Sequence, residues 1–150
     1  MWDYPRPPRV EISHCRIRVI FDGVIIADST RAKRMLETSH PPVYYIPFED
    51  IRMNLLIESP HRSFCEWKGA SSYYSIKTDG RAVEDAAWCY HSPNSMYATI
   101  KDHLAFYPSR VDACFVDEEK VEAQAGDFYG GWITKEIVGP FKGEAGTWGW

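Results

Sequence analysis

The sequence predicts a mainly β fold in a single domain, and three observations carry this prediction. The chain has 150 residues, which suits one domain able to bury one hydrophobic core. Ten glycines and ten prolines separate short apolar runs, a spacing typical of short strands joined by turns. Apolar residues make up 45% of the chain and aromatic residues 15%, which argues against intrinsic disorder.

The domain prediction has two parts. Residues 1–15 begin with a proline-rich stretch and are expected to form an extended arm. Residues 16–150 are expected to form one β domain, which includes a C-terminal tail rich in Gly and Trp.

The first predicted element is a β-hairpin. Residues 16–21 alternate polar and apolar side chains, as a half-buried strand does. Asp22-Gly23 supplies a tight turn, and residues 24–27 return as a buried strand. Residues 28–36 fit either a short helix that Asp28 or Ser29 caps or another strand.

The remaining elements are mostly short strands. Strands are predicted at residues 43–46, 55–57, 70–77, 86–90 and 132–138, and a hairpin joins residues 111–116 to 121–123 around residues 117–120. Pro47 to Asp50 reads as a turn or the first turn of a short helix. Residues 97–104 are the best helix candidate, because Ile100 and Leu104 lie four apart.

Charge and apolar content limit the partners that the chain is expected to have. The net charge is −4 and the pI is about 5.7, which argues against a general nucleic-acid binder. No apolar run approaches the roughly 20 residues of a membrane span, and the N-terminus lacks the apolar core of a signal peptide. We therefore expect a cytoplasmic protein whose four cysteines are reduced. The composition is also compatible with a homodimer.

Several ordered motifs resemble those of one family. They are Phe21-Asp22-Gly23, Val43-Tyr44-Tyr45-Ile46-Pro47, Cys65-x-x-Lys68-Gly69-x-x-x-Tyr73, Trp88-x-Tyr90-x-x-Pro93 and Phe128-Tyr129-Gly130-Gly131-Trp132. With these pieces the chain resembles the domain-of-unknown-function 427 family. The resemblance implies a β-tent-like fold, in which two antiparallel sheets lean together over a pocket, with one or two short helices.

The resemblance also bears on metal binding. Other proteins with the β-tent architecture hold a structural zinc with two Cys-x-x-Cys pairs, whereas here Lys68 stands where the second cysteine of such a pair would be. Further potential ligands are His61, Cys89, His91, His103 and Cys114, with Cys89 and His91 on one face of a strand, but the paired spacing of a zinc site is missing. We expect no metal and no cofactor.

Cys65 and Lys68 form the first candidate site. An ammonium group close to a thiol favours the reactive thiolate, and a Lys that loses its charge in an apolar pocket can act as a nucleophile or base. Alternatively, Cys65 is a buried, inert thiol beside a Lys that anchors the turn.

Glu37 and Asp50 form the second candidate site. The two carboxylates could bind a cationic or polyhydroxyl ligand, or act in acid–base catalysis if burial raises the pKa of one of them. The alternative is structural, with Asp50 as a helix cap and Glu37 in a salt bridge.

The third candidate site is aromatic. Strand alternation sends Tyr73 and Tyr74 to opposite faces and places Trp88 and Tyr90 on the same face. Same-face rings can wall a pocket that stacks a planar group or holds a cation, although aromatic residues also favour strands for packing alone. The expected pocket walls are Tyr45, Tyr73, Trp88, Tyr90 and Phe106, with Glu37, Asp50 and Lys68 as polar contacts.

Three functions remain open at this level. The first is a domain that binds an unidentified small molecule in the aromatic-lined pocket. The second is an enzyme that uses the same pocket, with Cys65 or Lys68 as nucleophile and Glu37 or Asp50 as acid or base. The third is a structural or protein-interaction module in which the aromatic residues are only core.

Overall fold

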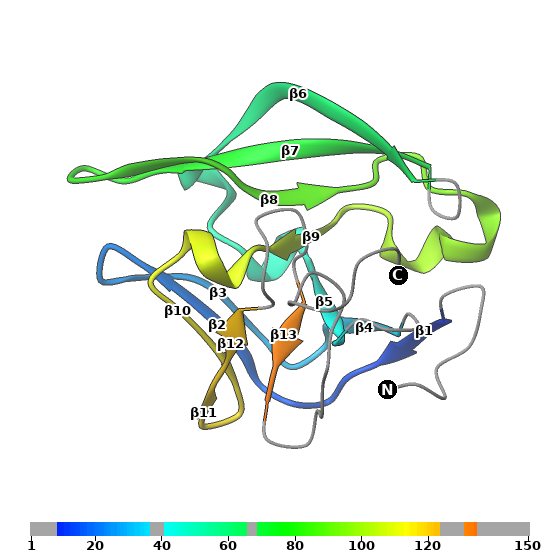
Figure 1. Cartoon of the computed structure of the whole chain (residues 1–150), viewed down its shortest axis with the longest axis horizontal. Coiled ribbons are helices and arrows are strands. Elements are labelled where there is room, and N and C mark those ends of the chain that lie inside the picture. Colours follow the sequence, from blue (N-terminus) through cyan, green and yellow to red (C-terminus); the bar gives the residue numbers. More distant parts are fainter. Residues whose placement is uncertain (1–8, 37–40, 66–68, 124–130, 135–150) are drawn as a thin grey trace, which may run out of the picture.

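The chain is mainly β, as predicted. The computed structural model describes residues 9–36, 41–65, 69–123 and 131–134. Its largest element is a seven-stranded antiparallel sheet, which turns from β6 at the top of Figure 1 to β1 at the lower right. In spatial order its strands are β1 (Arg9–Ile12), β4 (Lys33–Leu36), β5 (Val43–Pro47), β9 (His103–Phe106), β8 (Ala82–Cys89), β7 (Gly69–Lys77) and β6 (Leu56–Cys65).

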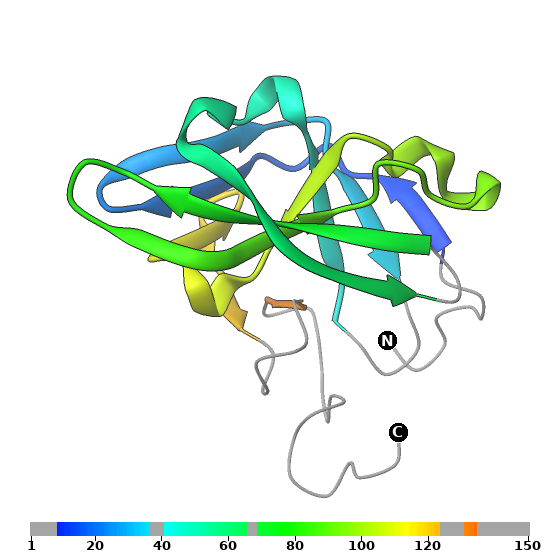
Figure 2. The same cartoon turned by 90° about the horizontal axis from the view of Figure 1, so that it is seen from above.

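Two smaller antiparallel sheets complete the β structure. The four-stranded sheet has the order β11 (Glu119–Lys120), β10 (Ala113–Val116), β2 (Ile17–Phe21) and β3 (Val24–Ser29). The two-stranded sheet pairs β12 (Glu122–Ala123) with β13 (Trp132–Ile133). Viewed from above, the long strands β6, β7 and β8 span the molecule (Figure 2).

The helical segments are short 3₁₀ turns. They are η1 (Phe48–Asp50), η2 (Met53–Leu55), η3 (Ser95–Ile100) and η4 (Pro108–Arg110). Among the described residues, no helix has both the length and the apolar character that crossing a bilayer requires.

The predicted hairpin around Asp22-Gly23 is confirmed. Asp22 and Gly23 have φ values of 53° and 71°, and Phe21 pairs with Val24 across the turn. Positive φ at both central residues gives the turn the twist of the flanking strands. Of the two alternatives for residues 28–36, the structure contains the strand, since β3 continues to Ser29 and β4 begins at Lys33.

The predicted helix over residues 97–104 is wrong. Its N-terminal part belongs to η3, but residues 103–106 form β9, which pairs with both β5 and β8. Asp102 turns the chain with φ 56°, and Ile100 and Leu104 then pack into two different hydrophobic clusters. The pairing of residues 103–106 with a strand on each side therefore outweighs the helical signal in the spacing of Ile100 and Leu104.

The predicted hairpin of residues 111–116 with 121–123 is also wrong in its second strand. β10 pairs with Glu119–Lys120 through a tighter turn at Asp117, whose φ is 54°. Residues 122–123 pair with Trp132–Ile133 instead. The rest of the predicted strand 132–138 lies outside the described residues, apart from Thr134.

The buried residues form two clusters on opposite faces of the seven-stranded sheet. The inner cluster joins this sheet to the four-stranded sheet and includes Phe21, Ile26, Ile46, Tyr74, Ile76, Cys89, Leu104, Phe106 and Trp132. The outer cluster lies on the other face and consists of Met35, Tyr45, Tyr73, Trp88, Tyr90, Tyr97, Ile100, Ala105 and Tyr107. Strand alternation explains the division, since Tyr73 belongs to the outer cluster and Tyr74 to the inner one.

Candidate functional site

A cross-strand row of side chains organises the outer cluster. Tyr45 pairs with Ala105, Ala105 with Trp88 and Trp88 with Tyr73. Residues directly opposite one another on neighbouring strands share a face. Because Ala105 occupies the middle of the row with a small side chain, Trp88 Nε1 can donate a hydrogen bond to the Tyr45 hydroxyl at 3.3 Å.

Four of the five predicted aromatic residues meet in this cluster. They are Tyr45, Tyr73, Trp88 and Tyr90, and each of them is less than 9% exposed. Trp88 and Tyr45 make an edge contact at 6.1 Å between ring centroids. The fifth, Phe106, lies in the inner cluster on the opposite face of the sheet. Alternation along β9 explains this, because Ala105 next to it faces the outer cluster.

Hydroxyl groups extend the outer cluster towards β6. The Ser63 hydroxyl lies 2.8 Å from the Tyr73 hydroxyl and also bonds Ser71. Burial and a hydrogen bond with Tyr73 raise the pKa of Tyr107 above its ordinary value. The Tyr107 phenol is therefore protonated at neutral pH and can donate a hydrogen bond.

Both strand ladders beside the middle of β7 are irregular. Glu58 pairs with Tyr74 and Arg62 with Ser72, so three residues of β6 lie opposite Tyr73. On the other side, the register between β7 and β8 shifts between Tyr74 and Ile76. Bulges of this kind bend a strand and re-aim its side chains.

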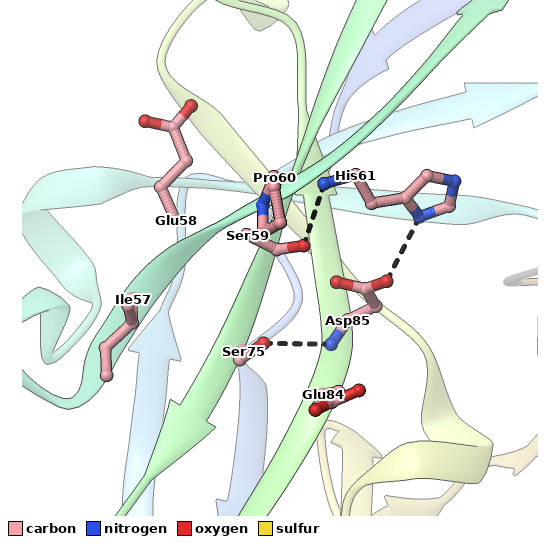
Figure 3. A pocket seen from close by; sticks show the side chains of 8 residues that line it. All are labelled: Ile57, Glu58, Ser59, Pro60, His61, Ser75, Glu84 and Asp85. Atoms are coloured by element: carbon pink, nitrogen blue, oxygen red, sulfur yellow. Dashed lines mark hydrogen bonds and ion pairs between the residues drawn. The ribbon is translucent and has the colours of Figure 1, made fainter.

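The two bulges bring His61 and Asp85 together (Figure 3). His61 Nδ1 lies 3.1 Å from Asp85 Oδ2, and the imidazole stacks on Tyr73 with 4.1 Å between ring centroids. Asp85 has φ 48°, a left-handed conformation that Asp tolerates better than most residues. The Ser75 hydroxyl accepts a hydrogen bond from the Asp85 backbone N–H.

One oxygen of Asp85 is left without a partner. Its Oδ1 is buried and accepts no hydrogen bond from the described residues. A buried acceptor without a donor costs about 1–3 kcal/mol.

A hollow of about 530 Å³ lies over this pair. Its lining consists of Ile57, Glu58, Ser59, Pro60, His61, Ser75, Glu84 and Asp85 (Figure 3). The volume is within the range of small-molecule sites. The predicted aromatic residues do not line it, but His61 connects the hollow to the outer cluster through Tyr73.

Asp50 makes an ion pair away from this hollow. Its carboxylate accepts hydrogen bonds from Arg31 at 2.9 Å and from the Ser29 hydroxyl at 2.7 Å. The hydrogen bond from Arg31 lowers the pKa of Asp50. This arrangement keeps the carboxylate charged, whereas an acid catalyst near neutral pH needs a raised pKa.

The remaining predicted site residues fall largely outside the described structure. Glu37 and Lys68 are not described. Cys65 is the last residue of β6 and its backbone pairs with Gly69, while its side chain is outside the described part. The Cys65–Lys68 site therefore stays a prediction.

The sequence reasoning missed the role of His61 and did not consider Asp85. His61 was a candidate metal ligand, but among the described residues no group of three His, Cys, Asp or Glu side chains could hold a metal ion. One signal was available: Glu84-Asp85 interrupts a run of strand residues with two acids before Ala86. Asp85 lies in the β8 bulge, where the register between β7 and β8 shifts.

Comparison with known proteins gives one result. A family model described as a domain of unknown function (DUF427) matches residues 9–117, which cover most of the chain and every residue of the hollow. No curated protein matches the sequence.

Proposed function

The chain belongs to the DUF427 family, and we propose that it binds a small molecule in the hollow between the β6 and β8 bulges. The Asp85 carboxylate carries this proposal, because one of its oxygens bonds His61 while the other is buried and accepts no hydrogen bond from the part of the chain that the structure describes. Such a group is out of place in a purely structural bulge, where it costs stability.

The lining residues favour a ligand with positively charged N–H donors. Asp85 lines the hollow beside His61, and Glu84 lines it as well, whereas the Glu58 carboxylate pairs with Arg62 at 3.2 Å and lies near His91 on the other face of the sheet. A guanidinium or ammonium group in the hollow would gain from the negative charge of the Asp85 carboxylate. The imidazole of His61, stacked on Tyr73, offers a flat apolar surface beside it.

Titration with methylguanidinium, followed by two-dimensional amide NMR, tests the proposal. We expect saturable shifts at His61, Ser75 and Asp85, and no such shifts with acetate. Asp85→Asn should abolish them, because Asn keeps the size of the side chain and tolerates the left-handed backbone but lacks the charge. Glu84→Gln is the matched control, since Glu84 lines the same hollow outside the His61 pair, and it should retain most of the affinity.

Two results would contradict the proposal. One is the absence of saturable shifts at millimolar methylguanidinium. The other is equal affinity in the wild type and in Asp85→Asn. Either would favour the structural or interaction module, in which the outer cluster is only core.

The enzyme, the homodimer and the cytoplasmic location remain predictions. Rapid and selective labelling of Cys65 by a thiol reagent near neutral pH would support the thiol version of the enzyme. Native mass spectrometry of the purified chain would measure the oligomeric state.

A further inference from the structure

A second group of reactive side chains lies on the opposite face of β7 and β8 from the hollow. It contains Tyr74 of β7, Cys89 of β8, His91 just after β8 and Asp102 in the turn before β9. His91 is central: its Nε2 lies 3.5 Å from Cys89 Sγ and 3.2 Å from the Tyr74 hydroxyl. Its Nδ1 lies 3.4 Å from Asp102 Oδ1.

The Asp102 contact assigns the roles of the two imidazole nitrogens. A proton on Nδ1 is directed at the Asp102 carboxylate, which leaves Nε2 of the neutral ring as an acceptor. Nε2 is then the acceptor that faces two donors, the Tyr74 hydroxyl and the Cys89 thiol, and it takes the thiol proton when the Tyr74 hydroxyl turns away from it. A nucleophile, a base and a group that orients the base form the arrangement used in thiol catalysis.

Burial alone would make Cys89 inert. The residue is 0% exposed, and burial raises the pKa of its thiol to about 12. At neutral pH the thiol keeps its proton, so its reactivity depends on a base within hydrogen-bond distance. Cys114, in the same inner cluster, is 1% exposed and burial raises its pKa as well. Cys89 and Cys114 thus both have almost no exposed surface, and Cys89 has the His91 contact.

We propose that Cys89, with His91 as its base and Asp102 as the residue that positions His91, is a thiol that small hydroperoxides oxidise. The proton of Sγ passes to His91 Nε2 as sulfur attacks one peroxide oxygen. The S–O bond forms, the O–O bond breaks, and the leaving oxygen takes the proton from His91. A thiol and a hydroperoxide thereby become a sulfenic acid and an alcohol, or water when the reagent is hydrogen peroxide.

The surroundings of the cluster favour a small, neutral reagent. The side chain of His91 is 41% exposed, so it forms the solvent side of the cluster, and the sulfur lies behind it. Asp102, 3.4 Å from His91 Nδ1, adds a negative charge that disfavours anionic reagents, whereas Glu58, 3.9 Å from Nε2, is paired with Arg62. Hydrogen peroxide meets both conditions.

The experiment compares the two buried cysteines within the same molecule. The full chain is treated with hydrogen peroxide at pH 7 in the presence of dimedone, and adducts at Cys89 and Cys114 are followed by peptide mass spectrometry. We expect Cys89 to react at least about tenfold faster, a conservative figure for general base catalysis. Equal rates would overturn the proposal, because they would show that opening of the core controls both thiols.

Two variants test the roles of the neighbours. His91→Gln should slow adduct formation at Cys89 by about tenfold or more and leave the rate at Cys114 unchanged. Asp102→Asn should slow adduct formation at Cys89 by a smaller factor than His91→Gln does. If a variant loosened the fold, adduct formation at Cys114 would become faster, so the Cys114 rate reports on folding in the same sample. An unchanged Cys89 rate in His91→Gln would refute the assignment of His91 as the base.

Discussion

At the scale of single residues, the structure distinguishes an acid whose two oxygens both have partners, Asp50, from Asp85, one of whose oxygens has no partner among the described residues. Asp50 is satisfied by Arg31 and Ser29, whereas Asp85 keeps one buried oxygen without a partner. Both are polar residues beside apolar segments in the sequence. Only their neighbours in space distinguish a stabilising ion pair from a candidate ligand contact.

Asp50→Asn tests the structural role of this carboxylate. We expect the free energy of unfolding at pH 7 to fall by about 1 kcal/mol, since the bonds are charge-assisted but Arg31 is 58% exposed. The lowered pKa of Asp50 means that its contribution is fully present above the ordinary Asp pKa of 3.8 and is lost as the pH falls through the lowered value. Urea unfolding of both proteins should therefore show a difference that shrinks in acid.

Asp28→Asn is the control for that measurement. Asp28 pairs with Arg16, and the two side chains are 39% and 48% exposed. Its replacement should cost less than that of Asp50, because exposed pairs contribute little. A loss at pH 7 that persists unchanged in acid would contradict the assigned role of Asp50.

At the scale of elements, hairpin turns and bulges determine where the side chains point. The β2–β3 turn requires positive φ at Asp22 and Gly23, and that requirement is visible in the sequence. The bulges opposite Tyr73 are not, because they depend on the pairing of β6 and β8 with β7. Pro60 in the β6 bulge also removes a backbone donor from the edge strand, which protects this edge against pairing with another chain.

Gly23→Ala tests the turn. The added Cβ would meet no atom within 4 Å, so the cost comes only from the φ of +71°. We expect a loss of about 1 kcal/mol in the free energy of unfolding. Gly23→Asn should lose less, since Asn adopts this conformation more readily. Chemical denaturation measures both, and equal stability of Gly23→Ala and the wild type would disprove the strain.

At the scale of the whole molecule, the side chain of Trp132 packs the last described strand, β13, against the core. Trp132 is 0% exposed, donates from Nε1 to the Phe106 carbonyl at 3.1 Å and packs on Tyr44. It lies beyond the segment that the family model matches. The inner cluster therefore extends past residue 117 and includes side chains from all three sheets.

Trp132→Ala should lower the free energy of unfolding by about 3–5 kcal/mol, the usual cost of removing a large aromatic side chain from a core. Trp132→Phe should cost less, because it keeps most of the ring and loses the hydrogen bond to Phe106. Urea unfolding provides both values. A loss below about 1 kcal/mol for Trp132→Ala would show that residues after 123 contribute little to the core.

Much of the fold was predictable, because it depends on local signals. Asp22-Gly23 predicted the first hairpin, and alternation correctly divided Tyr73 from Tyr74. The predicted helix over residues 97–104 was wrong, because the spacing of its apolar residues says nothing of β5 and β8, the strands that pair with β9 on either side. For the candidate site, alternation predicted the shared face of Trp88 and Tyr90, but Phe106 lies on the other face.

The sequence by itself determined the mainly β class and the first hairpin turn, since composition, alternation and Asp-Gly at a turn act over a few residues, and its ordered motifs carry the resemblance to the family. Strand alternation already put Cys89 and His91 on one face, but only the tertiary structure decided that His61 meets Asp85 and that Asp102 meets His91. These contacts join residues whose separation in space depends on strand register and on bulges. Register is set by pairing between distant segments, which no local pattern encodes.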